Sequence, residues 1–183
     1  VSSLQAVNGA TSINGSPSNL SDIINCLIPY DDDTLIFGCD HSIVQMSGDP
    51  MEGGRADVIA RIGMAFGRSY CIEPETMQIF FLATNGGIYK FVPGSKPTPI
   101  SGAIKRRLEG IDLRESTVSM AWDHAAQGLG VWITPNDPDE DGTNFFYEAR
   151  TQAWFPEFYT NKLHSPMTVY TYDSDDPGDR AVF

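Results

Sequence analysis

Residues 121–132 read AWDHAAQGLGVW, in which an apolar residue and an acid end one run, a short turn follows, and a second apolar run begins. This pattern recurs, because the pairs Tyr30-Asp31, Ile72-Glu73, Trp122-Asp123 and Tyr172-Asp173 each precede a hydrophobic run. The acids of these pairs lie 42, 50 and 50 residues apart. Runs of this kind around a turn predict paired β-strands. We therefore predict a unit of about fifty residues that repeats along the chain.

Short runs bounded by Gly, Pro, Asn or Asp predict an all-β chain. The predicted strands are 25–30, 34–38, 42–47, 69–73, 77–83, 87–92, 117–122, 128–134, 144–149, 167–172 and 180–183. Candidates for a fourth strand in each unit are 56–59, 98–101 and 154–158. One segment, 101–110, has the pattern of a short helix, which we expect to be capped by Ser101 and stopped by Gly110.

A period of 40 to 50 residues with about four strands per unit is typical of β-propeller blades. We expect a lead-in at 1–24, blades at 25–62, 63–112 and 113–163, and the start of a further blade at 164–183, with a linker helix near 102–109. Propellers close with about 4 to 8 blades, so we expect the chain to be part of a larger propeller. A β-sandwich is the alternative, although it does not predict an acid at one fixed place in every unit.

The composition excludes several classes of protein. The chain has 183 residues, 41% of them hydrophobic, which is enough for a globular core. Its net charge of -12 argues against a partner with a phosphate backbone. The longest apolar runs, such as 79–83, fall far short of the roughly 18 residues of a membrane span, so we expect none. Three cysteines, Cys26, Cys39 and Cys71, form no C-x-x-C pair and are expected to be buried free thiols.

One segment matches the pattern of a calcium-binding loop, because residues 137–148 satisfy D-x-D-x-D-G-x5-E. Yet an extended strand would carry Glu148 about 13 Å beyond Asn144, too far to complete the coordination shell. Two interpretations remain: a shortened calcium site made by Asp137, Asp139 and Asp141, or a solvated acidic hairpin tip. The acidic turn at 173–179 offers the same two interpretations.

Other residues that could bind a metal ion, a subunit or a sugar also have structural explanations. The histidines, His41, His124 and His164, share no metal-ligand spacing and are expected on the surface or in turns. The basic run 105–107 is either a solvated helix face or a contact for the acidic turns of an adjacent subunit. The aromatic segment 154–159 either wedges between blades or stacks on sugar rings. No nucleotide-binding, hydrolase or metalloprotease motif is present, which favours a protein that is not an enzyme.

Several short motifs carry a resemblance to a known family. They are LIFG (35–38), GDP (48–50), GGR (53–55), IG (62–63), FG (66–67), GGIY (86–89), PIS (99–101), AWD (121–123) and DRAV (179–182). With the repeats, they make the chain from about residue 27 onward similar to the β-propeller portion of bacteriophage virion proteins, in particular tail nozzle or tail tube-terminal components.

This resemblance implies a structural, non-enzymatic role in the tail of a virion that is assembled in the host cytoplasm. The implied partners are other copies of the chain and other tail proteins, with DNA passing through and not being bound specifically. An acidic surface would let DNA slide without sticking.

Two other functions remain open. In a carbohydrate-binding or glycan-hydrolysing propeller, the acids Asp31, Glu73, Asp123 and Asp173 would lie near one rim. Glycoside hydrolysis needs two carboxylates about 5 to 9.5 Å apart, whereas one acid per blade would be spread around a ring, where it can simply form a turn. The third function is that of a cellular scaffold propeller.

Overall fold

A computed structural model of the chain describes residues 22–49, 54–137, 139–158, 168–169, 171–172, 176 and 181–182. The protein is all-β, and three consecutive segments each form a four-stranded antiparallel sheet in which neighbouring strands follow one another in sequence. These sheets begin at Ile24, Tyr70 and Ser116, which are 46 residues apart. The predicted lead-in up to residue 21 and most of the segment from 159 onward lie outside the described residues.

The strand predictions are confirmed for the three sheets, including the fourth strands. The first sheet consists of β1 (Ile24–Asp31), β2 (Thr34–Cys39), β3 (Ile43–Ser47) and β4 (Arg55–Ala60). The second consists of β5 (Tyr70–Ile72), β6 (Ile79–Leu82), β7 (Ile88–Phe91) and β8 (Thr98–Pro99). The third consists of β9 (Ser116–Asp123), β10 (Gly128–Pro135), β11 (Thr143–Glu148) and β12 (Ala153–Glu157). After it, β13 (Thr171–Tyr172) pairs with β14 (Ala181–Val182).

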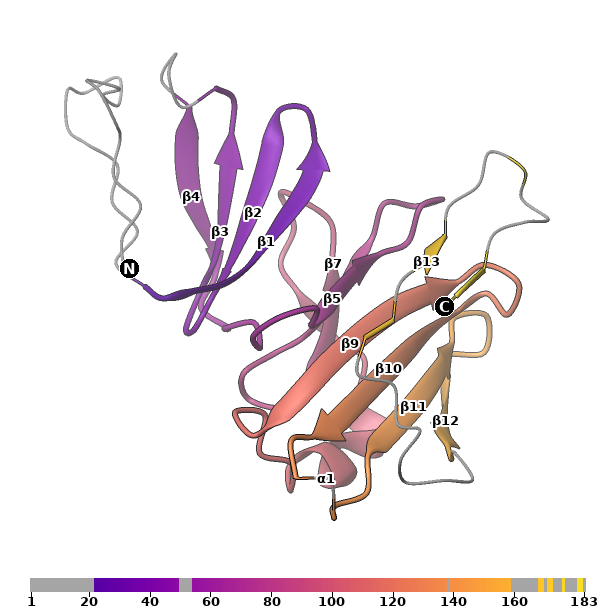
Figure 1. Ribbon diagram of the computed structural model, residues 1–183. Helices are drawn as coiled ribbons and strands as arrows, with labels where there is room; N and C mark the ends of the chain where they lie inside the picture. Colours follow the sequence, from indigo (N-terminus) through magenta and orange to yellow (C-terminus); the bar gives the residue numbers. More distant parts are fainter. Residues whose placement is uncertain are drawn as a thin grey trace.

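The second sheet lies between the other two (Figure 1) and is covered on both faces. Its strand β6 shows this directly, because successive side chains of a strand point to opposite faces. Ile79 and Phe81 pack against the first sheet, in a cluster with Ile28 and Ile36. Phe80 and Leu82 pack instead against the third sheet, where the ring of Phe80 stacks on that of Trp122 with centroids 5.5 Å apart. The three sheets are therefore stacked face to face.

The short helical segment joins the second sheet to the third. It consists of the 3-10 turn η1 (Gly102–Ile104) and the single-turn helix α1 (Lys105–Leu108), with Ile104 and Leu108 buried in the core between these sheets. The predicted capping was wrong, because no side chain caps this segment. The hydroxyl of Ser101 accepts a hydrogen bond from the buried backbone N–H of Ile88 instead, at 2.9 Å. Ser101 thus supplies the hydrogen-bond acceptor for the first residue of β7.

Replacing Ser101 with alanine would leave the N–H of Ile88 buried without its acceptor. We expect Ser101→Ala to lower the free energy of unfolding by about 2 kcal/mol, the cost of an unsatisfied buried donor. Urea denaturation would measure it. The control is Ser95→Ala, which removes the hydroxyl of an exposed turn where water replaces it. Equal stability of the two variants would contradict this assignment.

The three cysteines are free, as predicted. Cys26 and Cys39 are buried, whereas Cys71 is only partly buried. Burial raises the pKa of the Cys26 thiol to about 12, and it also raises the pKa of Cys71. At neutral pH both side chains are therefore thiols, which pack as small apolar groups and are poor nucleophiles.

Candidate functional site

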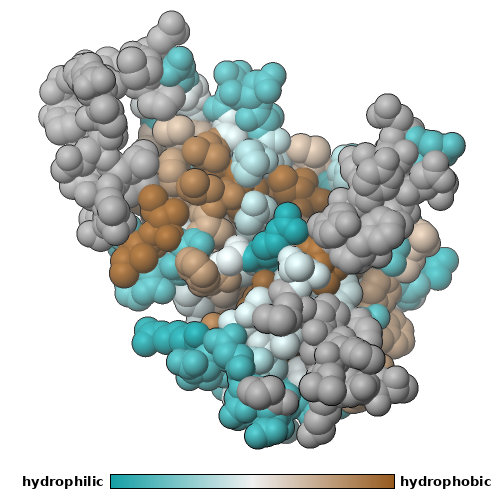
Figure 2. All heavy atoms as spheres, in the orientation of Figure 1, coloured by the Kyte–Doolittle hydropathy of each residue, from teal (hydrophilic) through white to brown (hydrophobic). Residues whose placement is uncertain are grey.

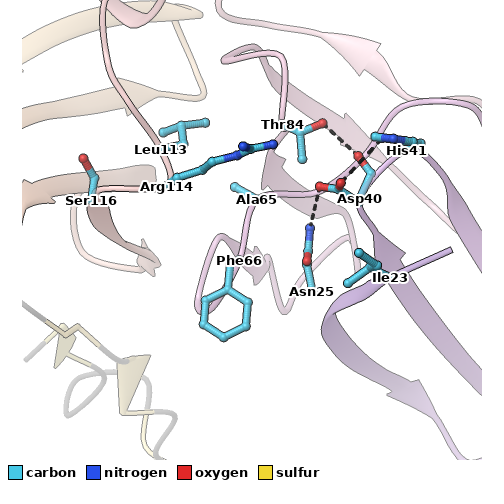
Figure 3. A pocket seen from close by; sticks show the side chains of 10 residues that line it. All are labelled: Ile23, Asn25, Asp40, His41, Ala65, Phe66, Thr84, Leu113, Arg114 and Ser116. Atoms are coloured by element: carbon cyan, nitrogen blue, oxygen red, sulfur yellow. Dashed lines mark hydrogen bonds and ion pairs between the residues drawn. The ribbon is translucent and has the colours of Figure 1, made fainter. Parts of the chain in front are cut away.

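An open cleft of about 560 Å³ lies at one end of the strands, where the three sheets meet (Figure 3). It is built from the start of β1, the turns after β2 and β6, and the connections that lead into β5 and β9. Since neighbouring strands run antiparallel, these segments belong to the same end of the sheets. Its lining residues are Ile23, Asn25, Asp40, His41, Ala65, Phe66, Thr84, Leu113, Arg114 and Ser116.

One wall of this cleft is a hydrogen-bond network that fastens the first sheet to the second. The side-chain amide of Asn25 donates to the carbonyl of Met64 at 2.8 Å. The hydroxyl of Thr84 donates to the carbonyl of Asp40 at 3.1 Å, and the N–H of Thr84 donates to the carbonyl of Gly63 at 3.1 Å. These polar groups therefore hold the connection between the two sheets in place.

Asp22 supports the same corner from outside the cleft. Its Oδ2 atom accepts hydrogen bonds from the hydroxyl of Ser42 at 2.7 Å and from the N–H of His41 at 2.9 Å. Slight burial acts to raise the pKa of Asp22, but these bonds and one from the N–H of Ile23 outweigh it, so the pKa lies below its ordinary value of 3.8. The folded chain therefore favours the ionised carboxylate.

A lowered pKa in the folded state gives stability that is present above pH 3.8 and is lost as the pH falls through the folded-state pKa. We expect Asp22→Asn to lower the free energy of unfolding by about 1 kcal/mol at pH 7, because charged acceptors make the stronger hydrogen bonds. The difference from the parent should shrink as the pH falls below 3.8. Urea denaturation across this range would measure it, with the exposed Asp32→Asn as the control. A difference that is constant with pH would contradict the assignment.

The open side of the cleft carries side chains that are available to a ligand. The ring of Phe66 is 76% exposed, and His41 is also exposed, as predicted for a surface histidine. The guanidinium of Arg114 forms no ion pair with any residue in the described part of the chain, and Figure 3 shows it extending across the cleft toward Thr84. An aromatic ring and a cation that line the same cleft can bind a polar, planar or ring-shaped ligand.

The three recurring acids that the structure describes, Asp31, Glu73 and Asp123, lie at the end of the strands opposite this cleft, where they form turns. Asp31 Oδ1 accepts from the N–H of Asp33 at 3.0 Å, and Asp123 Oδ1 accepts from the N–H of Ala126 at 3.0 Å. Glu73 is buried and accepts a hydrogen bond from the hydroxyl of Thr76. The fourth acid, Asp173, lies outside the described residues. In the three described repeats, the acid is explained by the turn that it stabilises.

A second cleft, of about 490 Å³, lies at this opposite end, between the second and third sheets. It brings Glu73 and Glu148 to one cavity, together with Gln127 and Arg150. Hydrogen bonds from Thr151 and Arg150 outweigh desolvation and lower the pKa of Glu148. This direction argues against Glu148 as the general acid of glycoside hydrolysis, a role that needs a raised pKa.

The proposed calcium loop forms the turn between β10 and β11. The N–H of Asp139 donates to Asp137 Oδ1 at 2.9 Å, an interaction typical of an aspartate-stabilised turn. Glu148 lies at the far end of β11, as expected, and cannot join this loop. Within residues 22–49, 54–137, 139–158 and the few described beyond them, no three His, Cys, Asp or Glu side chains gather to hold a metal ion. Calcium binding by Asp137, Asp139 and Asp141 stays a prediction. Of the acidic turn at 173–179, only Asp176 is described.

The structure describes residues of the basic run 105–107 and of the aromatic segment 154–159. Lys105 is exposed on α1 and pairs with Glu109 at 3.5 Å, which fits a solvated helix face. Trp154 wedges between the second and third sheets, as predicted, because its indole N–H donates to the carbonyl of Ile100 at 2.9 Å. Phe155 and Phe158 are exposed instead, so these two side chains do not pack between the sheets that the structure describes. His124 lies in the turn after β9 but is buried there.

Comparison with known proteins adds no assignment, because no protein-family model and no curated protein matches this chain. None of the helices in the described part of the chain is long and apolar enough to cross a membrane.

Proposed function

We propose that this chain supplies stacked blades of a larger β-propeller that serves as a non-enzymatic structural component of a bacteriophage tail, of the nozzle or tail-tube type. The observation that carries the proposal is the stack itself, in which three four-stranded antiparallel sheets pack against one another face to face. A two-layer sandwich would leave each sheet one face for solvent, whereas β6 is apolar on both faces.

The outer face of the first sheet supports continuation of the stack. Residues paired across strands point to the same face, so Leu27, Phe37, Val44 and Val58 form one row across all four strands. A second row consists of Pro29, Leu35, Met46 and Ala56. Both rows are entirely apolar, and Figure 2 shows hydrophobic side chains at the surface in the region of this sheet. Leu27 and Val58 are exposed, whereas Phe37 and Val44 are buried at the centre of the face. The equivalent faces of the second and third sheets are each covered by the preceding sheet.

The role in a tail rests on the sequence resemblance and on the charge. The chain carries 24 acidic against 12 basic residues, and acids of the described loops, such as Asp31, Asp33 and Asp139, lie exposed in turns. Such loops repel a phosphate backbone and would let DNA pass without specific contacts. Sheet stacking supplies a rigid frame, and the loops supply contacts to other copies of the chain and to other tail proteins.

Labelling of virions tests this role. Gold-conjugated antibodies raised against the purified chain should decorate the tails of intact phage particles in negative-stain electron microscopy. Pre-incubation of the antibodies with the purified chain should abolish the decoration. Particles that remain bare on their tails, while a tail protein of the same particles is labelled in parallel, would contradict the proposal.

A carbohydrate-binding propeller is the second candidate, and the exposed ring of Phe66 beside Asn25 and Arg114 favours it. Sugars stack on exposed aromatic rings and bond to planar polar side chains. A glycan array separates the two functions: a carbohydrate-binding protein would select defined glycans and lose them in Phe66→Ala, whereas a tail component of the kind proposed would show no selectivity.

A further inference from the structure

The last strands of the three sheets differ in how well they are protected against pairing with a further strand. β4, β8 and β12 each end their sheet, so each pairs with a neighbouring strand on one side only within the described residues. An edge strand points alternate N–H and C=O groups away from the sheet and can pair with a further strand. Proline blocks this pairing, and it occurs in β8 as Pro99 and in β12 as Pro156. β4 contains no proline.

The hydrogen-bond pattern identifies the groups of β4 that point outward. The N–H of Cys39 donates to the carbonyl of Ser42 at 2.8 Å, which fixes the alternation along β2 and β3. Val44 and Met46 then bond to β2, and Gln45 and Ser47 bond to β4. On β4, Asp57 and Arg55 lie opposite Gln45 and Ser47 and point toward β3. The N–H and C=O groups of Ala56 and Val58 therefore point away from the sheet.

A cleft of about 390 Å³ adjoins this edge, between β4 and the loop that follows β7. Ile59, Ala60, Ile62 and Pro97 give it apolar walls. The loop is anchored to the first sheet, because the N–H of Gly94 donates to the side-chain carbonyl of Gln45 at 3.0 Å. The hydroxyl of Ser95 also closes the loop onto the carbonyl of Val92 at 2.7 Å. The cleft is thus held open by contacts that are already made.

Positive charge lies at one end of this edge. Arg61 and Lys96 line the cleft, are exposed, and form no ion pair with any residue that the structure describes. At the other end, Arg55 is neutralised by Asp57 at 2.6 Å. On a chain with a net charge of -12, two unpaired cations beside an apolar cleft favour an acidic partner.

We propose that β4 and the adjoining cleft form a docking site for an extended segment of a partner protein, which adds to the first sheet as a fifth strand. The segment pairs with the outward groups of Ala56 and Val58, places an apolar side chain between Ile59 and Pro97, and presents an acidic residue to Arg61 and Lys96. Backbone pairing supplies affinity, and the cleft and its charges supply specificity. The pairing uses the backbone groups at the edge of the first sheet, whereas the stacking uses side chains on its outer face, to which the side chain of Val58 also belongs.

The test selects peptides from a display library of random linear sequences with the full chain as bait. We expect enriched peptides to combine alternating apolar residues with an acidic residue. Val58→Pro removes the outward N–H and should weaken their binding about tenfold, whereas Val58→Thr keeps this N–H and should retain it. The double variant Arg61→Glu and Lys96→Glu should weaken binding to a similar extent, and Arg107→Glu on α1 should have no effect. Circular dichroism would verify that each variant is folded.

Hydrogen exchange supplies the second readout. The amides of Ala56 and Val58 should exchange quickly in the free chain and become protected when a selected peptide is added. Three results would each overturn the proposal: amides that are already protected in the free chain, selected peptides without acidic residues, or peptides that bind Val58→Pro as well as the parent. A selection that enriches no peptide would overturn it too.

Discussion

Phe81→Ala is expected to lower the free energy of unfolding by about 4 kcal/mol, because truncation of a buried aromatic side chain removes its contacts and leaves a cavity. Phe81 is fully buried between the first and second sheets. Its ring stacks on Tyr89 with centroids 5.5 Å apart and meets the edge of Phe91 at 5.6 Å, so the truncation also removes two aromatic contacts. Urea or thermal denaturation would measure the loss.

Two further variants test whether the loss of stability in Phe81→Ala reflects a second sheet that is covered on both faces. Phe80→Ala should cost a similar amount, because Phe80 points from the same strand into the opposite interface, against Trp122. Phe66→Ala is the matched control, since this ring is 76% exposed and its removal should change stability by less than about 0.5 kcal/mol. If only one of Phe80 and Phe81 were important for stability, the second sheet would not be covered on both faces.

Gly63→Ala is expected to lower the free energy of unfolding by about 3 kcal/mol, because overpacking against a fixed backbone forces the chain to shift. A Cβ atom at this position would lie 1.8 Å from the carbonyl oxygen of Asp40. Moving either segment would disturb the bond from the N–H of Thr84 to the carbonyl of Gly63, at 3.1 Å, which joins the first two sheets. Thermal denaturation would measure the change.

Gly102→Ala is the control for Gly63→Ala. No atom lies within 4 Å of a Cβ added at Gly102, so the same chemical change should leave stability within about 0.5 kcal/mol of the parent. Equal stability of the two glycine variants would mean that the connection between the first and second sheets does not need its close approach to Asp40.

The strands could be predicted from the sequence because the residues that determine them are neighbours along the chain. Alternating or continuous apolar runs bounded by turn residues located β1, β6 and β10 to within about two residues. The recurring acid was also a correct sign of a turn, since Asp31 and Asp123 each accept a backbone N–H a few residues further on. The left-handed backbone of Gln127 could not be predicted from the sequence, because Gly is the residue usually expected in this conformation.

The site could be predicted far less well, because it depends on how distant segments meet. Asn25, Thr84 and Arg114 come from different sheets or connections, and no spacing along the chain links them. The predicted cap at Ser101 was wrong for the same reason. The local sequence pattern favoured a helix cap, but the hydroxyl of Ser101 accepts a hydrogen bond from the buried N–H of Ile88, which lies on another element. The prolines of β8 and β12 were a signal for the free edge of β4 that sequence reasoning could have used.

Cryo-electron microscopy of the assembly that contains this chain would show how its sheets are arranged. We expect four-stranded sheets arranged as neighbours around a common axis, with a further sheet packed on the apolar rows that contain Phe37 and Leu35. A map in which this outer face of the first sheet is open to solvent, or in which the sheets form a two-layer sandwich, would contradict it.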